Sequence, residues 1–111
     1  MKYQLKESND IAVLSLEEER LDTNVAPDLK AQLLILIDAR KKVLLNLEFV
    51  QYADSSGLGA ILLGYRQARD LGARFAVCGM QKRVYSLFSI AQLDSRITIY
   101  KDEKEGLQQM K

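Results

Sequence analysis

The sequence contains no histidine, and this absence excludes several kinds of active site at once. Histidine is the commonest general base and the commonest metal ligand, so neither a Ser-His-Asp triad nor a Cys-His pair can form within one chain. No zinc-binding pattern is present either, and we expect no cofactor. The one cysteine, Cys78, cannot form an internal disulfide, which fits a reducing compartment. These absences argue against an enzyme.

The chain also lacks an excess of charge of either sign, and it lacks long apolar runs. Sixteen Lys and Arg against fifteen Asp and Glu leave a formal net charge of +1, which creates no long-range field for nucleic acid or an anionic membrane. The longest uncharged apolar run, residues 33–37, is far shorter than the roughly 20 residues of a membrane span. The first residues lack the apolar region of a signal peptide. We expect a cytoplasmic protein with no membrane span and no direct nucleic-acid partner.

Short apolar runs alternate along the chain with segments of helical spacing. The runs predict strands in residues 1–6, 11–16, 43–47, 74–79 and 97–100. The helical spacing predicts helices that begin after Thr23-Asn24, at Ser55, at Lys82 and at Asp102. Because strands that alternate with helices form parallel sheets, we expect an α/β fold, with a mixed, largely parallel sheet of about five strands and about four helices. No linker divides the chain, so these elements are expected to form one domain over residues 1–111.

Two of the predicted helices have recognisable ends and buried faces. Thr23-Asn24 offers an N-cap to the first helix, and Pro27 and Asp28 suit its first turn. Its predicted buried stripe consists of Val25, Leu29, Leu33, Leu36 and Ile37. The second helix ends at a glycine cap, Gly72, and its predicted buried residues are Leu58, Ile61, Leu62, Tyr65 and Ala68.

The segment Asp54-Ser55-Ser56-Gly57 links the predicted central strand to the start of the second helix, where open parallel sheets place their functional groups. A hydroxyl at that junction lies beside the unpaired N–H groups of the first helical turn. A phosphate on it would be stabilised by those donors, and it would add a charge of about −1.5 to −2 to a neutral surface. Phosphorylation of this hydroxyl can therefore switch the binding of a partner protein. The alternative interpretation is that the serine after Asp54 only caps the helix.

Small residues form a second pattern on the same predicted helix. Gly57, Ala60 and Gly64 recur at three-and-four spacing, which permits the close approach of another backbone. The approaching chain is either a partner protein or the sheet and helices of this domain, and the pattern does not distinguish between them.

The string Asp54-Ser55-Ser56-Gly57-Leu58-Gly59, with the strand 43–48 before it and Leu21-Asp22 before the first helix, resembles the STAS domain of bacterial anti-sigma factor antagonists. Val77-Cys78 and residues 84–88 match later segments of that domain in the same order, so the resemblance covers nearly the whole chain. It implies a STAS-like fold and a protein that binds an anti-sigma factor, which is also a serine kinase, and so releases a sigma factor for transcription.

The resemblance also implies roles for particular residues. The serine directly after Asp54, Ser55, corresponds to the phosphorylated residue, and Ser56 is the neighbour that either caps the helix or is mistaken for it. Modification by the kinase ends the interaction, and a metal-dependent serine phosphatase restores it. The surface that meets the partner is expected to include Asp22, Asp54, Ser56, Gly57 and Leu58. Whether the chain forms oligomers is left open.

Other interpretations remain beside this one. STAS-like domains also serve as subunits of lipid-transport complexes, as sensory scaffold components and as the cytoplasmic tails of anion transporters, so a non-enzymatic subunit of a larger assembly is the alternative function. A dinucleotide-binding loop fails because its third glycine would fall at Leu62, although a nucleotide site at Asp54-Ser55 stays possible. Cys78 lies in an apolar strand and is expected to be structural.

Overall fold

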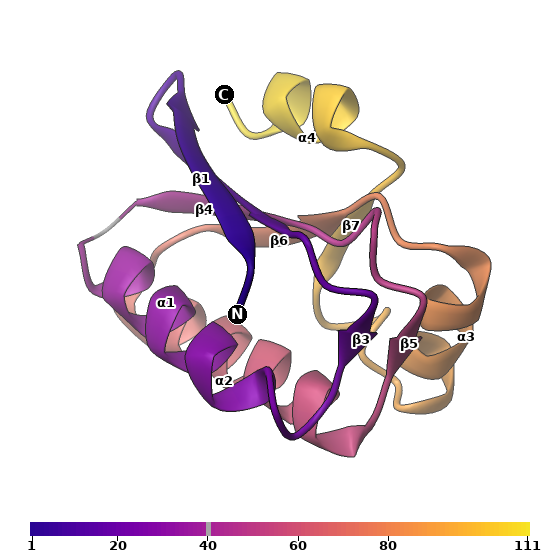
Figure 1. The fold of residues 1–111 in the computed structure, drawn as a ribbon. Coiled ribbons are helices and arrows are strands. Elements are labelled where there is room, and N and C mark those ends of the chain that lie inside the picture. The colour runs from indigo at the N-terminus through magenta and orange to yellow at the C-terminus, as the bar shows by residue number, and fades with distance from the viewer. Residues whose placement is uncertain (40) are drawn as a thin grey trace.

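The computed structural model describes residues 1–39 and 41–111 and contains a five-stranded sheet in the order β1-β2-β4-β6-β7 (Figure 1). The strands are β1 (Tyr3–Ser8), β2 (Ile11–Leu16), β4 (Lys42–Asn46), β6 (Phe75–Cys78) and β7 (Thr98–Tyr100). Only β1 and β2 pair in the antiparallel sense, and the other neighbours are parallel. The predicted α/β class and the mixed, largely parallel sheet are confirmed, and β4 is the central strand as expected.

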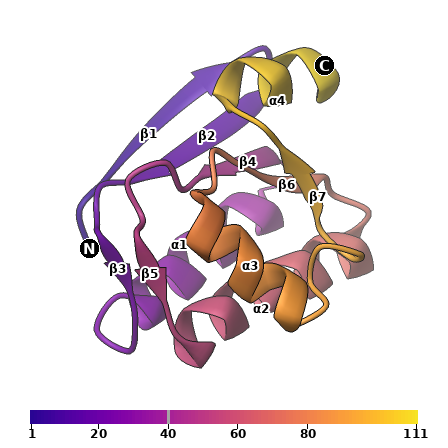
Figure 2. The ribbon, with the colours of Figure 1, turned by 90° about the vertical axis from the view of Figure 1, so that its right-hand side faces the viewer.

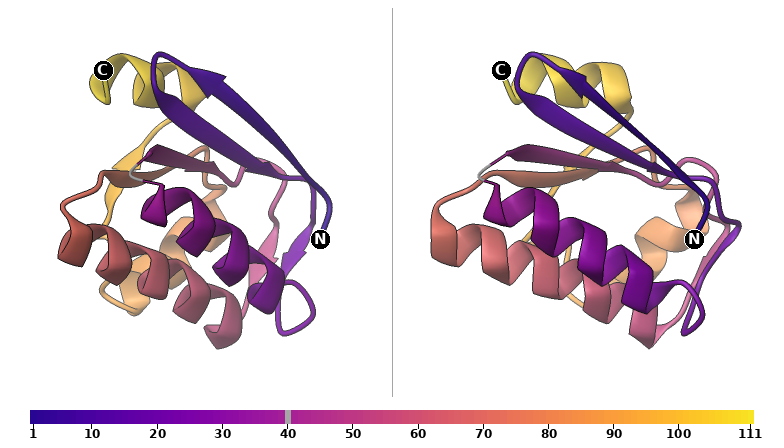
Figure 3. Two further views of the ribbon diagram at one scale, coloured as in Figure 1. Left: turned by 90° about the vertical axis from the view of Figure 1, so that its left-hand side faces the viewer. Right: turned by 60° about the vertical axis from the view of Figure 1, so that its left-hand side comes forward.

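Helices cover both faces of this sheet. They are α1 (Ala26–Asp38), α2 (Ser55–Leu71), α3 (Lys82–Ile90) and α4 (Glu103–Gln109). Figures 2 and 3 show α1 and α2 side by side below the sheet, α4 above it, and α3 beside the short strand β5 (Tyr52–Ala53). Within the part of the chain that the structure describes, no helix combines the length and apolar character needed to cross a bilayer.

The central strands are buried on both faces, which explains their unbroken apolar runs. Side chains alternate across a strand, so Ala12 and Leu14 of β2 point to the side of α1 and α2, while Ile11 and Val13 point to the side of α4. The larger core lies below the sheet. The smaller one consists of Ile11, Val13, Leu44, Ala76, Cys78 and Met110.

The closing helix α4 is attached to the sheet by polar as well as apolar contacts. Asn46 is buried at the end of β4, and its amide donates to Glu103 Oε1 at 3.1 Å. Lys6 Nζ lies 2.6 Å from Glu103 Oε2. Burial opposes the charge of Glu103, but the hydrogen bonds from Lys6 and Asn46 outweigh it, so the pKa of Glu103 is held below its ordinary value.

The predicted N-cap of the first helix is wrong. The helix begins at Ala26, its N-cap is Val25, and no side chain caps it. Thr23 and Asn24 lie in a turn that Asp22 organises, because the carbonyl of Asp22 accepts from the amides of Val25 and Ala26 at 3.0 and 2.8 Å. The predicted buried stripe of this helix is confirmed, since every one of its residues is at most 9% exposed.

The buried face of α2 differs from the prediction, because most of its buried residues are small. Its buried residues are Gly57, Ala60, Ile61, Gly64 and Ala68, whereas Leu58, Leu62 and Tyr65 are only partly buried. A methyl group on Gly64 would lie 3.0 Å from Leu33 Cδ1 of α1. Gly57 and Gly64 of the stripe of small residues therefore serve the packing of this domain. The predicted C-cap is confirmed, since Gly72 has a φ of +69°.

Candidate functional site

Two short strands that the sequence analysis did not identify position the candidate site. β3 (Arg20–Leu21) and β5 (Tyr52–Ala53) form a parallel two-stranded ribbon apart from the main sheet (Figures 1 and 2). The ribbon continues past the strands, because the amide of Asp54 donates to the carbonyl of Leu21 at 3.1 Å. In the register Leu21 pairs with Ala53, so the next residues, Asp22 and Asp54, lie at the same end of the ribbon.

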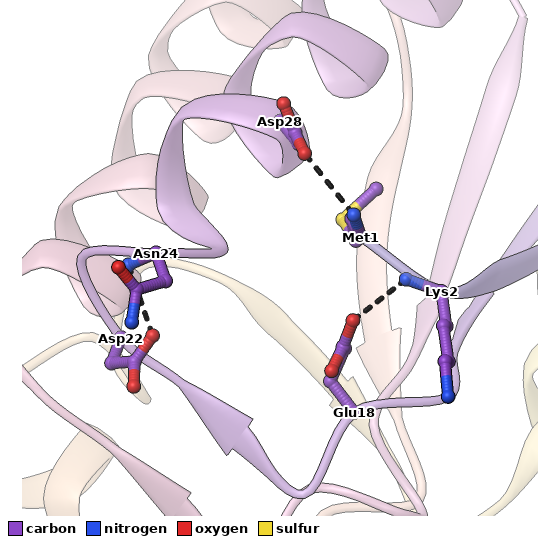
Figure 4. A network of polar contacts seen from close by, with 6 residues as sticks. All are labelled: Met1, Lys2, Glu18, Asp22, Asn24 and Asp28. Atoms are coloured by element: carbon purple, nitrogen blue, oxygen red, sulfur yellow. Dashed lines mark hydrogen bonds and ion pairs between the residues drawn. The ribbon is translucent and has the colours of Figure 1, made fainter.

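Asp22 organises the chain that leaves β3. Its Oδ1 accepts from the amide of Asn24 at 3.0 Å (Figure 4). Its Oδ2 lies 3.6 Å from Arg20 Nε. The same region holds the start of the chain, because the amino group of Met1 pairs with Asp28 at 3.2 Å. The Asp22 carboxylate is thus fixed by a backbone donor and a cation, and it remains partly exposed.

Asp54 is the N-cap of α2, and Ser55 is the first residue of the helix. The backbone of Asp54 is extended, and its Oδ1 accepts from the amide of Gly57 at 3.1 Å. Ser55 is exposed, and within residues 1–39 and 41–111 its hydroxyl makes no hydrogen bond. The interpretation that Ser55 or Ser56 caps the helix is therefore wrong. The Ser55 hydroxyl faces solvent and stabilises no part of the described structure through a hydrogen bond.

The capping bond gives a direct stability prediction. We expect Asp54→Ala to lower the free energy of unfolding by about 1 kcal/mol, because the Gly57 amide loses its acceptor at the helix start. Asp54→Asn keeps an oxygen at the same position, so it should lower the free energy of unfolding much less. Urea unfolding of the three proteins measures the difference, and equal losses for both variants would show that the bond does not stabilise the helix.

The remaining residues that were predicted to contact a partner differ in how deeply they are buried. Ser56 and Leu58 are partly buried, and Leu58 packs against the main core. Gly57 is buried, and a methyl group on it would lie 2.4 Å from the carbonyl oxygen of Leu21. Gly57 therefore brings the helix start against β3 and does not offer a surface of its own to a partner. Among the residues predicted for the site, Ser55 is exposed, while Asp22 and Asp54 are partly buried at the same end of the ribbon.

The family model of the STAS domain matches residues 2–106 of the chain. The chain belongs to the STAS domain family. Among curated relatives, the anti-sigma F factor antagonist of Paenibacillus polymyxa is 27% identical over 112 residues, which cover 99% of this chain and 95% of the relative.

Solved structures show the same STAS fold. An anti-sigma-factor antagonist domain protein from Planctomyces limnophilus has a TM-score of 0.88 at 19% identity and is covered over 97% of both chains. The phosphorylated form of SpoIIAA, a Bacillus cell fate determinant, has a TM-score of 0.75 at 19% identity, with 99% of this chain and 100% of that chain covered. At these identities the comparison establishes the fold of the STAS domain alone.

Sequence reasoning missed two residues of this STAS domain that lie beside the site. The Arg20 guanidinium lies 4.6 Å from the centre of the Tyr52 ring while it also pairs with Asp22, so it links β3 to β5. A signal was available in the sequence, because Arg20-Leu21-Asp22 and Tyr52-Ala53-Asp54 share an exposed residue, a buried apolar residue and an aspartate. Each segment is too short to show a strand period.

The cysteine of the STAS domain is not activated. Cys78 is fully buried, and burial together with the nearby negative charge of Glu103 raises its pKa to about 12. It is a thiol and not a thiolate at neutral pH, which agrees with the structural role predicted for it. Residues 1–39 and 41–111 contain no group of three His, Cys, Asp or Glu side chains placed to hold a metal ion.

Proposed function

We propose that this protein is an anti-sigma factor antagonist whose binding is controlled by phosphorylation of Ser55. In its unmodified state it captures an anti-sigma factor that is also a serine kinase, and the sigma factor held by that kinase is released for transcription. The kinase then phosphorylates Ser55 and the complex dissociates. A serine phosphatase restores the first state. These steps take place in the cytoplasm and require no catalysis by this chain.

The observation that carries the proposal is the position of the Ser55 hydroxyl. It is exposed at the first residue of a 17-residue helix, and Asp54 has already taken the capping role. The amides of Ser55 and Ser56 form no hydrogen bond with the residues that the structure describes, so two backbone donors are available to a phosphate. The modified state can therefore be tolerated by the fold.

The same modification changes what the surface offers to another protein. The unmodified end of the ribbon carries Asp22 and Asp54, and the neutral hydroxyl of Ser55 follows directly after Asp54. A phosphate adds about −1.5 to −2 charge to this end of the ribbon, and the Arg20 cation of β3 is already paired with Asp22. A partner surface that fits the neutral hydroxyl then meets concentrated negative charge, which repels it and must be desolvated. The names of the curated relative and of the phosphorylated structural neighbour agree with this kind of control.

The proposal is tested by incubating the protein with ATP, Mg²⁺ and the anti-sigma factor kinase of its own organism, followed by mapping the product by mass spectrometry. We expect one phosphate, located on Ser55. Ser55→Ala should abolish it and Ser56→Ala should leave it in place. If the phosphate is on Ser56, the assigned residue is wrong. If the kinase neither binds nor modifies the chain, the alternative of a STAS subunit in a larger assembly is favoured.

A further inference from the structure

A solvent-facing groove of about 500 Å³ lies between α1 and α2. Two of its lining residues, Ala26 and Ala60, are buried, and Leu62 and Leu63 add apolar surface along α2. A methyl group on Gly59 would meet no atom within 4 Å, so the missing side chain of this glycine leaves part of the groove open. Leu63 is 40% exposed, so its side chain contributes solvent-accessible apolar surface to the groove.

Two cations border this apolar groove. Lys30 lines it from α1 and Arg66 lines it from α2. Neither forms an ion pair within the described part of the chain, whereas Lys6, Arg20, Lys41 and Arg69 all do. The groove lining in residues 1–39 and 41–111 includes no Asp or Glu, and Asp28 in the first turn of α1 is occupied by the amino group of Met1. The local charge is therefore positive although the whole chain is nearly neutral.

We propose that this groove binds an amphipathic helix of a partner protein, with acidic residues on both sides of its apolar stripe. Two neighbouring helices leave a channel in which a third helix can lie, and α1 and α2 lie side by side along their length (Figure 3). An extended peptide would need the backbone groups of a free strand edge, and both walls of this groove are helical. Because each wall carries a cation, the groove favours a helix with Asp or Glu on both sides of its apolar stripe.

This surface goes beyond the proposed function. Its apolar floor and its two cations do not include the hydroxyl of Ser55, and only Ser56 lies both in the groove and next to the modified residue. The two proposals therefore rest on different residues and are tested by different measurements.

A selection experiment identifies the occupant by its chemistry. A display library of helical peptides with randomised apolar, acidic and basic positions is panned on the full chain and depleted on Gly59→Trp, which fills the groove from an unobstructed position. We expect the surviving peptides to carry apolar residues at helical spacing with Asp or Glu on both flanks. Survivors with basic flanks, or none that discriminate against Gly59→Trp, would overturn the proposal.

Charge reversal then tests the two cations. We expect Lys30→Glu and Arg66→Glu each to lower the affinity for a selected peptide by about 10-fold, as measured by fluorescence anisotropy. Lys104→Glu makes the same charge change on α4, across the sheet, and Ser89→Trp adds the same ring to the exposed side of α3, so neither should weaken binding. An unchanged affinity for Arg66→Glu contradicts the proposal. Vesicles with anionic lipid that bind the chain through the same residues would assign the groove to a membrane surface instead.

Discussion

Replacing Ser55 with aspartate should weaken capture of the anti-sigma factor kinase by roughly 5–150-fold, the usual range of coupling between a modification and a binding event. The reason is electrostatic, because the added carboxylate joins Asp22 and Asp54 at one end of the β3–β5 ribbon. Ser55→Ala should retain capture and lose the ability to be inactivated. Biosensor binding of the kinase to the three proteins gives both results.

The stability of these variants is the necessary control. Since the Ser55 side chain is exposed and does not cap the helix, neither change should alter the free energy of unfolding by more than about 0.5 kcal/mol. A loss of capture by Ser55→Ala would mean that the partner recognises the hydroxyl itself. Full capture by Ser55→Asp would show that negative charge at this position does not control binding of the kinase.

The second large effect is expected at Gly57. A methyl group there would lie 2.4 Å from the carbonyl oxygen and 2.5 Å from Cγ of Leu21, so the helix start and β3 must separate. We expect Gly57→Ala to lower the free energy of unfolding by about 1–3 kcal/mol, which is the usual cost of overpacking. Urea unfolding measures the loss, and a separated ribbon should also reduce capture of the kinase.

Gly59 provides the matched control, two residues along the same helix. A methyl group there meets nothing within 4 Å, so Gly59→Ala should raise the free energy of unfolding by about 0.5–1 kcal/mol through helix propensity alone. The two glycines therefore respond with opposite sign to the same substitution. If both variants were stabilised, the close approach of α2 to Leu21 would not be a constraint on the site.

Elements with a strong periodic signal could be predicted from the sequence. The strand Ile11–Leu16 has the bounds that the apolar pattern indicates, and the helix Lys82–Ile90 begins at the predicted residue. Their side chains reach a core on one or both faces, so hydropathy reports burial directly. The position of the candidate site followed for the same reason, since the segment after the central strand leads into a long helix with a glycine cap at its end.

Features that depend on tertiary contact could not be predicted. β3 and β5 have two residues each and exist because they pair with each other, a contact between segments about 30 residues apart in the chain. The inner face of α2 was misassigned because Gly57 and Gly64 are buried through their lack of a side chain, which no hydropathy pattern records. The N-cap of α1 was misassigned because the turn is made by Asp22 one residue earlier than the expected cap.

In the proposed function, a phosphate on Ser55 decides whether the anti-sigma factor kinase can bind. The most direct test is the calorimetric affinity of the kinase for protein carrying phosphoserine only at position 55, compared with the unmodified chain. We predict tight binding of the unmodified protein and a loss of about 100-fold on phosphorylation, with the fold intact by circular dichroism. Equal affinities of the two forms would contradict the account.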